Sequence, residues 1–245
     1  MARRDEILAY ADELLEVSKY REFAPAGAQV LGADEVRKVV CGVSSSTQLF
    51  HRAVTRDAQL VLVHHGLFWR NVPLLVDQRL KSRLQALFEA DMTLAAYHLP
   101  LDAHRELGNA AQLAAALAID VDAQFTDFGV GGRISASRDE LVSRVRAATD
   151  REPLVFAYGP DRLHRVAVAT GSGGYELLQA AREGYDAYVT GEAEEPNMHA
   201  AEELGITLIA AGHYATERLG VQALARHLAE RFELEWEFVD LPNPV

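Results

Sequence analysis

The sequence predicts an α/β protein made of two α/β halves with mostly parallel βαβ units. Short apolar runs alternate with segments of helical period along the whole chain, and strands that alternate with helices in this way favour a parallel sheet. The length of 245 residues exceeds one typical domain of roughly 150. Glycines cluster in the stretch 124–132. We therefore expect the halves to be residues 1–126 and 127–245.

The first half contains four segments of helical period and three apolar runs. Serines 44–46 offer a cap for the second helix. The predicted helices are 3–18, 46–56, 77–90 and 105–117, and the predicted strands are 36–43, 59–63 and 92–97.

The second half repeats the alternation. Its last helix and strand are the elements that could pack back on the first half. The predicted strands are 132–135, 154–158, 164–170, 187–190, 206–210 and 233–239, and the predicted helices are 175–184, 195–204 and 215–231.

Composition excludes several classes of protein. The 24 basic and 36 acidic residues give a net charge of −12, which disfavours binding to nucleic acid or to anionic membranes. No apolar run reaches the ~18 residues of a membrane span, and the first residues do not form a secretory leader. The single cysteine, Cys41, excludes an internal disulfide and a cysteine-rich zinc site. We expect a cytoplasmic protein.

Metal-type ligands follow three of the predicted strands. In an open α/β sheet, ligands bind outside the carboxyl ends of the strands, so these side chains are expected in one cleft. Asp102 and Glu217 would bridge two ions. Strand by strand, the residues are His64 and His65, then His98 and Asp102, then His213 and Glu217.

Each of these residues also has an ordinary structural interpretation. His98 alone is typical of a hydrogen-bonded structural histidine. Asp102 alone would cap the helix 105–117, and Glu217 alone would be a first-turn carboxylate. If a helix begins near His213, then His213 and Glu217 lie one turn apart on one face. The combination favours a metal site.

Two further segments follow strands in the second half. The turn Gly171-Ser172-Gly173-Gly174 precedes a helix and is either a plain tight turn or a contact for an anion such as a phosphate. It lacks the full spacing of a dinucleotide-binding or P-loop motif. Glu192 ends another strand and is either a surface acid or a site acid. No nucleophile elbow is present, so the sequence does not support nucleophilic catalysis.

Several segments together resemble a known family. They are LVLVHHGLFW, AAYHLPLDAHRELGNAAQLAAAL, VAVATGSGG, YVTGE and GHYATERLGVQALARHL. In order and spacing they resemble the Nif-three-like dinuclear metal centre proteins, often labelled "GTP cyclohydrolase 1 type 2 homolog". The likeness covers essentially the whole chain and matches the short bacterial form.

The resemblance implies a fold, a ligand set and an assembly. It implies the Nif-three-like fold and a homohexamer, a toroid of trimers with its metal sites facing an internal cavity. His98 and His104 match positions near the site, for roles beside the ligands or the substrate. The chain departs from many members at Gly66, where they have proline, and at Ala26, where they have asparagine. The implied metal ligands are His64, His65, Asp102, His213 and Glu217.

Two functions use this ligand set. The first is a metal-dependent hydrolase acting on a small anionic or nucleotide-type substrate, with water activated by two divalent ions per chain. The second is a non-enzymatic protein that stores, delivers or senses metal, or a regulatory scaffold. Imidazole and carboxylate ligands without thiolate suit Zn, Mn, Fe, Co or Ni. Phe68 and Trp69 follow the histidine pair and are expected in a subunit interface or under their own loop.

Overall fold

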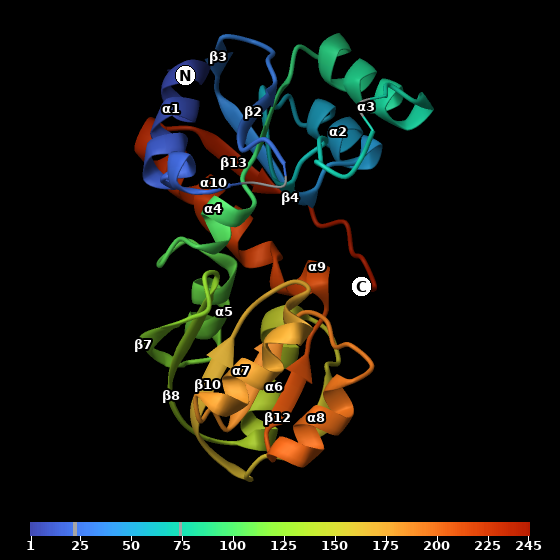
Figure 1. Cartoon of the computed structure of the whole chain (residues 1–245). Coiled ribbons are helices and arrows are strands. Elements are labelled where there is room, and N and C mark those ends of the chain that lie inside the picture. The colour runs from blue at the N-terminus through green and yellow to red at the C-terminus, as the bar shows by residue number, and fades with distance from the viewer. Residues whose placement is uncertain (22–23, 74) are drawn as a thin grey trace. The chain divides into compact units, whose positions relative to one another are not determined.

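The computed structural model describes residues 1–21, 24–73 and 75–245, and it confirms the α/β class (Figure 1). The chain forms two compact units. One consists of Met1–Leu101 with Val221–Leu241, and the other of Asp102–Gly220 with Pro242–Val245. Among the described residues, no helix is both long enough and apolar enough to cross a membrane.

The first unit is built on a five-stranded sheet. Its strands are β2 (Gly27–Val30), β4 (Lys38–Ser44), β5 (Leu60–His65), β6 (Thr93–Ala96) and β13 (Glu235–Phe238), in the order β13-β4-β5-β6-β2. The pairs β13–β4, β4–β5 and β5–β6 are parallel, and β2 is antiparallel to β6. β1 (Ala2–Arg3) and β3 (Glu35–Val36) form a separate short antiparallel pair.

Helices cover both faces of this sheet. They are α1 (Arg4–Leu14), α2 (Thr47–Val54), α3 (Gln78–Glu89) and α10 (Arg218–Phe232), with a 3-10 turn at Val17–Lys19. Figure 1 shows α2 and α3 on one side of the strands and α1 and α10 on the other.

The α2 and α3 face holds a well-packed core. Val61 and Val63 of β5 pack with Phe50 of α2 and Leu87 of α3, and all four side chains are buried. Full burial of one such side chain stabilises the fold by about 1.5–3 kcal/mol. Both helices begin where the sequence predicts a cap: Ser46 Oγ accepts from the Leu49 amide at 3.1 Å, and Asp77 Oδ1 accepts from the Leu80 amide at 2.7 Å.

The second unit has a six-stranded sheet. Its strands are β7 (Asp120–Phe125), β8 (Gly129–Ser137), β9 (Leu154–Ala157), β10 (Arg162–Val168), β11 (Ala187–Thr190) and β12 (Thr207–Ala210), in the order β7-β8-β10-β11-β12-β9. The central strands β10, β11 and β12 are parallel. The outer strands are antiparallel to their neighbours, because β7 and β8 form a hairpin and β9 joins the far edge.

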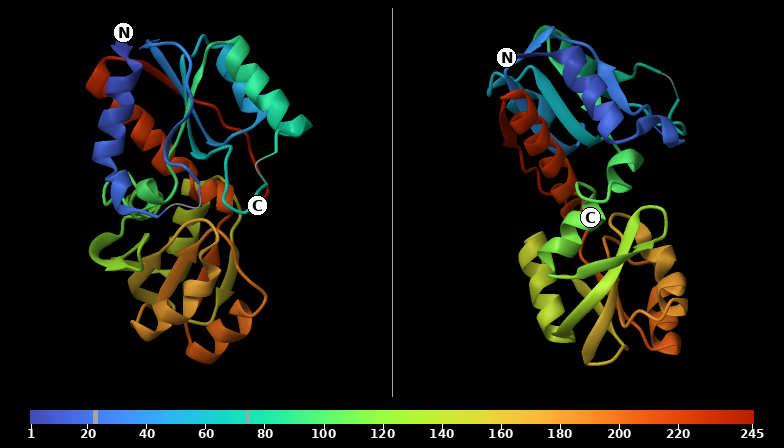
Figure 2. Two further views of the ribbon diagram at one scale, coloured as in Figure 1. Left: turned by 45° about the horizontal axis from the view of Figure 1, so that its top comes forward. Right: turned by 90° about the vertical axis from the view of Figure 1, so that its left-hand side faces the viewer.

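The helices of the second unit lie on both faces of its sheet. They are α5 (Asn109–Ala116), α6 (Arg138–Thr149), α7 (Leu177–Arg182) and α8 (Asn197–Leu204), with the short α9 (His213–Thr216) and a 3-10 turn at Gly173–Glu176. The short helix α4 (Leu99–Asp102) spans the boundary in sequence between the two units. Figure 2 shows α5 and α6 on one face and α7 and α8 on the other. Alternation along β10 explains this arrangement: Val166 and Val168 pack with α5 and α6, and Ala167 and Ala169 pack with α7 and α8.

The structure differs from the sequence prediction at several boundaries. Residue 102, not 127, begins the second unit, because β7 pairs with β8 and α5 packs against that sheet. The helix predicted over 105–117 begins at Asn109, after an N-cap at Gly108, so Asp102 does not cap it. The helix predicted over 215–231 is divided at Glu217 into α9 and α10.

Candidate metal-binding residues

His64 lies at the carboxyl end of β5 and is fully buried. Its Nδ1 lies 2.9 Å from the backbone oxygen of Tyr97. A carbonyl oxygen only accepts hydrogen bonds, so Nδ1 carries the proton and the lone pair is on Nε2. This is how metal-binding histidines are commonly held, with one nitrogen fixed and the other directed at the ion.

His65 is the next residue and is half-buried. Its Nδ1 lies 3.0 Å from the hydroxyl of Ser44, which is its register partner on β4. After the pair, the chain passes close to Gln29, whose Oε1 accepts from the Leu67 amide at 2.7 Å. A Cβ at Gly66 would collide with this Gln29 side chain. A larger residue at position 66 would therefore require the Gln29 side chain to move.

His98 joins the two histidines of β5. The candidate ligand atoms of His64, His65 and His98 all lie within 4.8 Å of one another. The ring centroid of His98 is 4.9 Å from that of His64 and 5.6 Å from that of His65. Trp69 packs against this imidazole group, 5.8 Å from the His65 ring and 5.2 Å from the His98 ring. The structure thus places His98 with the candidate ligands of the first unit.

A second group of candidate ligands lies in the second unit. His213 begins α9 and Glu217 follows it one turn later, as predicted, with His213 Nε2 3.0 Å from Glu217 Oε2. On the other side of the ring, Nδ1 lies 2.6 Å from Glu192 Oε1. Glu217 is 4% exposed. Glu192 therefore contacts the candidate ligand His213 and orients its ring.

The charges of this group favour a cation between its carboxylates. Burial acts to lower the pKa of His213, but the nearby Glu217 and Glu192 carboxylates outweigh it and raise the pKa to about 9. A ligand must be deprotonated to bind a metal, so a divalent ion would replace the proton of His213.

Asp102 is held by a polar network of the second unit. Its Oδ1 accepts from Asn109 Nδ2 at 2.8 Å. The Asn109 oxygen accepts from the Gly220 amide at 2.8 Å, and Asn109 is fully buried. His104 Nδ1 accepts from the Leu107 amide at 3.0 Å, in the turn before α5. Asp102 is thus positioned by residues that are far apart in the sequence.

The glycine turn after β10 supports the His213 and Glu217 pair. Gly171 adopts a positive φ of 65°, and a Cβ there would collide with the Glu217 carboxylate. The Gly171 amide donates to Thr216 Oγ1 at 3.2 Å, and the Gly173 oxygen accepts from Tyr188 Oη at 2.7 Å. These contacts make it a tight turn that packs closely against the candidate ligands.

The donor set fits a divalent ion. Imidazole nitrogens and carboxylate oxygens are borderline and hard ligands, which suit Zn, Mn, Fe, Co or Ni. The first unit supplies imidazoles held by backbone and hydroxyl groups, and the second supplies an imidazole between carboxylates.

Comparison with known families shows to which family the chain belongs. Residues 2–244 match the family described as Duf34/NIF3 (NGG1p interacting factor 3). The chain belongs to the Duf34/NIF3 family. A Pseudomonas aeruginosa protein named "GTP cyclohydrolase 1 type 2 homolog" is 42% identical over 241 residues, which cover 96% of this chain and 95% of that protein.

Solved structures of the family share its fold. One, described as protein ybgI of unknown function, is 40% identical, with a TM-score of 0.96 over 100% of both chains. A second, from Thermus thermophilus, is 35% identical, with a TM-score of 0.93 over 100% of both chains. The expected Nif-three-like fold is confirmed.

Proposed function

We propose that this Duf34/NIF3 protein is a divalent-metal-dependent hydrolase that acts on a nucleotide-type substrate. One observation carries the proposal: three imidazoles, those of His64, His65 and His98, bring their candidate ligand atoms within 4.8 Å of one another. Such a group of half-buried and buried imidazoles is costly unless their nitrogens are used. A metal ion is the ligand that this chemistry suits.

The proposed centre holds two ions per chain. The proposed ligands are His64, His65, Asp102, His213 and Glu217. Divalent ions there would supply Lewis-acid polarisation of a substrate and activation of water. The chain itself contributes orientation: Tyr97 fixes the tautomer of His64, and Glu192 fixes the His213 ring. His98 lies beside the β5 pair and serves as a ligand or as a contact to the substrate.

The substrate proposal rests on family relatives. Several bacterial relatives about 40% identical over nearly the full chain are named "GTP cyclohydrolase 1 type 2 homolog". A nucleotide carries anionic phosphates that divalent ions bind well.

We also propose a homohexamer, on the family resemblance. Phe68 and Trp69 are half-buried, and their expected place in a subunit interface stays a prediction. Phe68 packs against the apolar core and Trp69 against the histidine rings. Sedimentation of the protein near six times its chain mass of 26.9 kDa supports the hexamer, and a monomer at micromolar concentration contradicts it.

The hydrolase proposal is tested by activity screening of metal-loaded protein against nucleotides and phosphoesters. We expect turnover with Mn or Zn, and loss of turnover in His213→Ala. The matched control is His164→Ala, because His164 is exposed on β10 of the same unit. Two bound ions without turnover of any nucleotide or phosphoester would overturn hydrolysis and favour metal storage or delivery. Absence of bound metal would overturn both.

A further inference from the structure

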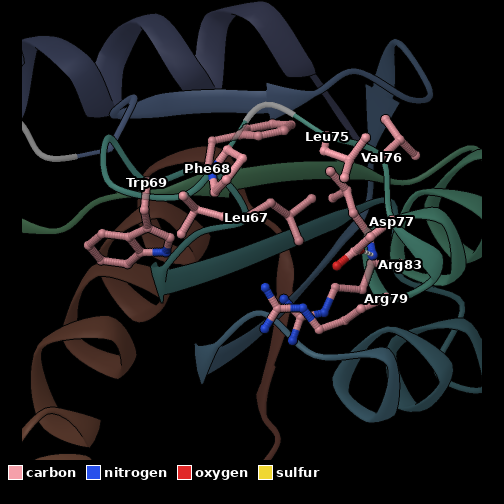
Figure 3. Close-up of a pocket in the computed structure, with 11 residues that line it drawn as sticks. Leu67, Phe68, Trp69, Leu75, Val76, Asp77, Arg79 and Arg83 are labelled. Atoms are coloured by element: carbon pink, nitrogen blue, oxygen red, sulfur yellow. Dashed lines mark hydrogen bonds between the residues drawn. The ribbon is translucent and has the colours of Figure 1, made fainter.

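The loop after β5 and the start of α3 enclose a cavity in the first unit. Its volume is about 240 Å³, which is small beside the roughly 300–1,000 Å³ of sites for drug-sized ligands. Leu67, Phe68 and Trp69 form one side, and Leu75 and Val76 form another (Figure 3). Leu75 is 67% exposed and Val76 is 61% exposed. The cavity therefore offers an apolar interior that a small molecule can enter from solvent.

Two arginines of α3 lie at the edge of this cavity. Arg79 and Arg83 are four residues apart, so they project from one face of the helix. Figure 3 draws both side chains among the residues that line the cavity. Burial of Arg83 and the nearby charge of Arg79 lower the pKa of Arg83, and the Asp77 carboxylate acts in the opposite direction. The two cations repel each other, so an anion between them would relieve that repulsion.

Asp77 lines the same cavity, and the charge of its carboxylate acts on Arg83. The Nε of Arg83 is buried without a hydrogen-bond partner among the residues described. The Asp77 carboxylate also accepts from the Leu80 amide as the cap of α3. One carboxylate faces two guanidinium groups, so this side of the cavity keeps a net positive charge. A further anion is therefore expected to come from outside the chain.

We propose that this cavity binds a small organic anion, whose apolar body enters the cavity and whose carboxylate or phosphate lies against Arg79 and Arg83. Guanidinium groups bind both anions through paired, charge-assisted hydrogen bonds. The apolar walls select a ligand with a hydrocarbon body over a bare inorganic anion.

Trp69 connects the cavity with the imidazole group. It lines the cavity and also packs against the rings of His65 and His98. A bound anion would therefore lie one side chain away from the candidate metal ligands. The site itself needs no metal, so it stands apart from the proposed hydrolase activity.

The experiment measures ligand binding by calorimetry and by Trp69 fluorescence. The background is Trp236→Phe, which leaves Trp69 as the one tryptophan, since the chain has two. The probes are octanoate and octyl phosphate, with 1-octanol as the neutral analogue and inorganic phosphate as the anion without a hydrocarbon body. All four probes are titrated with and without EDTA, so that binding in the cavity is measured separately from binding that depends on a metal ion.

We expect octanoate, octyl phosphate or both to bind and to change the Trp69 emission, with or without EDTA. Which of the two binds tighter identifies the anionic group. The double variant Arg79→Gln/Arg83→Gln should weaken their binding by about tenfold or more. Arg226→Gln, an exposed arginine on α10 at the opposite face of the sheet, is the control and should bind as the parent does.

Three results would overturn the proposal. One is equal affinity for 1-octanol and for both anions. Another is parental affinity in the double arginine variant, provided its circular dichroism is unchanged. The third is no binding of either anion together with a change in sedimentation of the double variant, which would assign this surface to contact with a second copy of the chain.

Discussion

The two groups of candidate ligands solve the problem of holding a cation in different ways. In the first unit, His64 and His65 are oriented by a backbone oxygen and a hydroxyl. In the second unit, His213 lies between Glu192 and Glu217. The first group is oriented by uncharged hydrogen-bond partners, and the second by carboxylates. We infer that removing charge and removing geometry will have separable effects on metal binding.

The largest effect is expected at Glu217. Glu217→Gln keeps the shape of the side chain and removes the charge that holds a second cation. We expect loss of at least one ion per chain with the fold retained, measured by elemental analysis after loading with Mn or Zn and by circular dichroism.

Glu202→Gln on α8 is the matched control, because Glu202 is an exposed acid of the same unit. If Glu217→Gln binds two ions as tightly as the parent, then Glu217 is not a ligand and the contrast between the two groups fails.

A smaller effect is expected at His98. His98→Ala removes one imidazole of the first group but none of the carboxylates of the second. We expect metal affinity to fall by about 10–100-fold, the range for residues that support ligands, while two ions still bind at high metal concentration. Competition with a fluorescent chelator measures the affinity. Loss of one ion per chain would instead show that His98 is a direct ligand.

A still smaller effect is expected at Ser44. Ser44→Ala removes the hydrogen bond to His65 Nδ1, which contributes about 0.5–1.5 kcal/mol. We expect metal affinity to fall by about tenfold or less, with the stoichiometry unchanged. The same chelator competition measures it, and Ser45→Ala next to it is the control. An equal loss in both variants would show that the effect is not specific to His65.

The smallest effect concerns a buried acid of the second unit that is not a candidate ligand. Burial raises the pKa of Glu176, which accepts from Tyr188 Oη at 3.2 Å. The folded protein therefore binds this proton more tightly than the unfolded chain does, and stability falls as pH rises through and above the ordinary pKa of 4.5. Glu176→Gln should reduce that fall.

Urea unfolding of the parent and of Glu176→Gln at pH 4, 5, 6 and 7 measures this effect. The free energies of unfolding should move apart in favour of the variant as pH rises. A constant difference across this range would show that Glu176 has the same pKa in both states.

The sequence predicts the candidate ligands because their positions follow from a simple rule. Parallel strands present their carboxyl ends at one edge, so polar residues after buried runs are visible as site candidates. His213 and Glu217 contact each other as their four-residue spacing requires. Glu192, which the sequence leaves open between a surface acid and a site acid, lies 2.6 Å from His213.

The residues that position the ligands were not predicted, because their partners are distant in sequence. Ser44 meets His65 through strand register, and Asn109 meets Asp102 and Gly220 only in the folded unit. Alone, each looks like an ordinary cap or helix residue.

Two elements of the second unit were also missed. β7 carries Asp120 and Asp122 and is largely exposed, so it has no apolar run to mark it. α6 has few apolar residues, but its capping box at Ser137 and Glu140 was a usable signal.

The pairing of β13 with β4 affects the order in which the chain can fold during synthesis. The second unit is nearly continuous in sequence, so its sheet can form as soon as residues 102–220 have left the ribosome. The first unit begins earlier but is completed later, because its sheet lacks an edge strand until Glu235–Phe238 arrives. Until then β4 presents unpaired backbone groups that can join strands of other chains. A chain released from the ribosome after residue 220 but before Glu235–Phe238 would therefore be prone to aggregation.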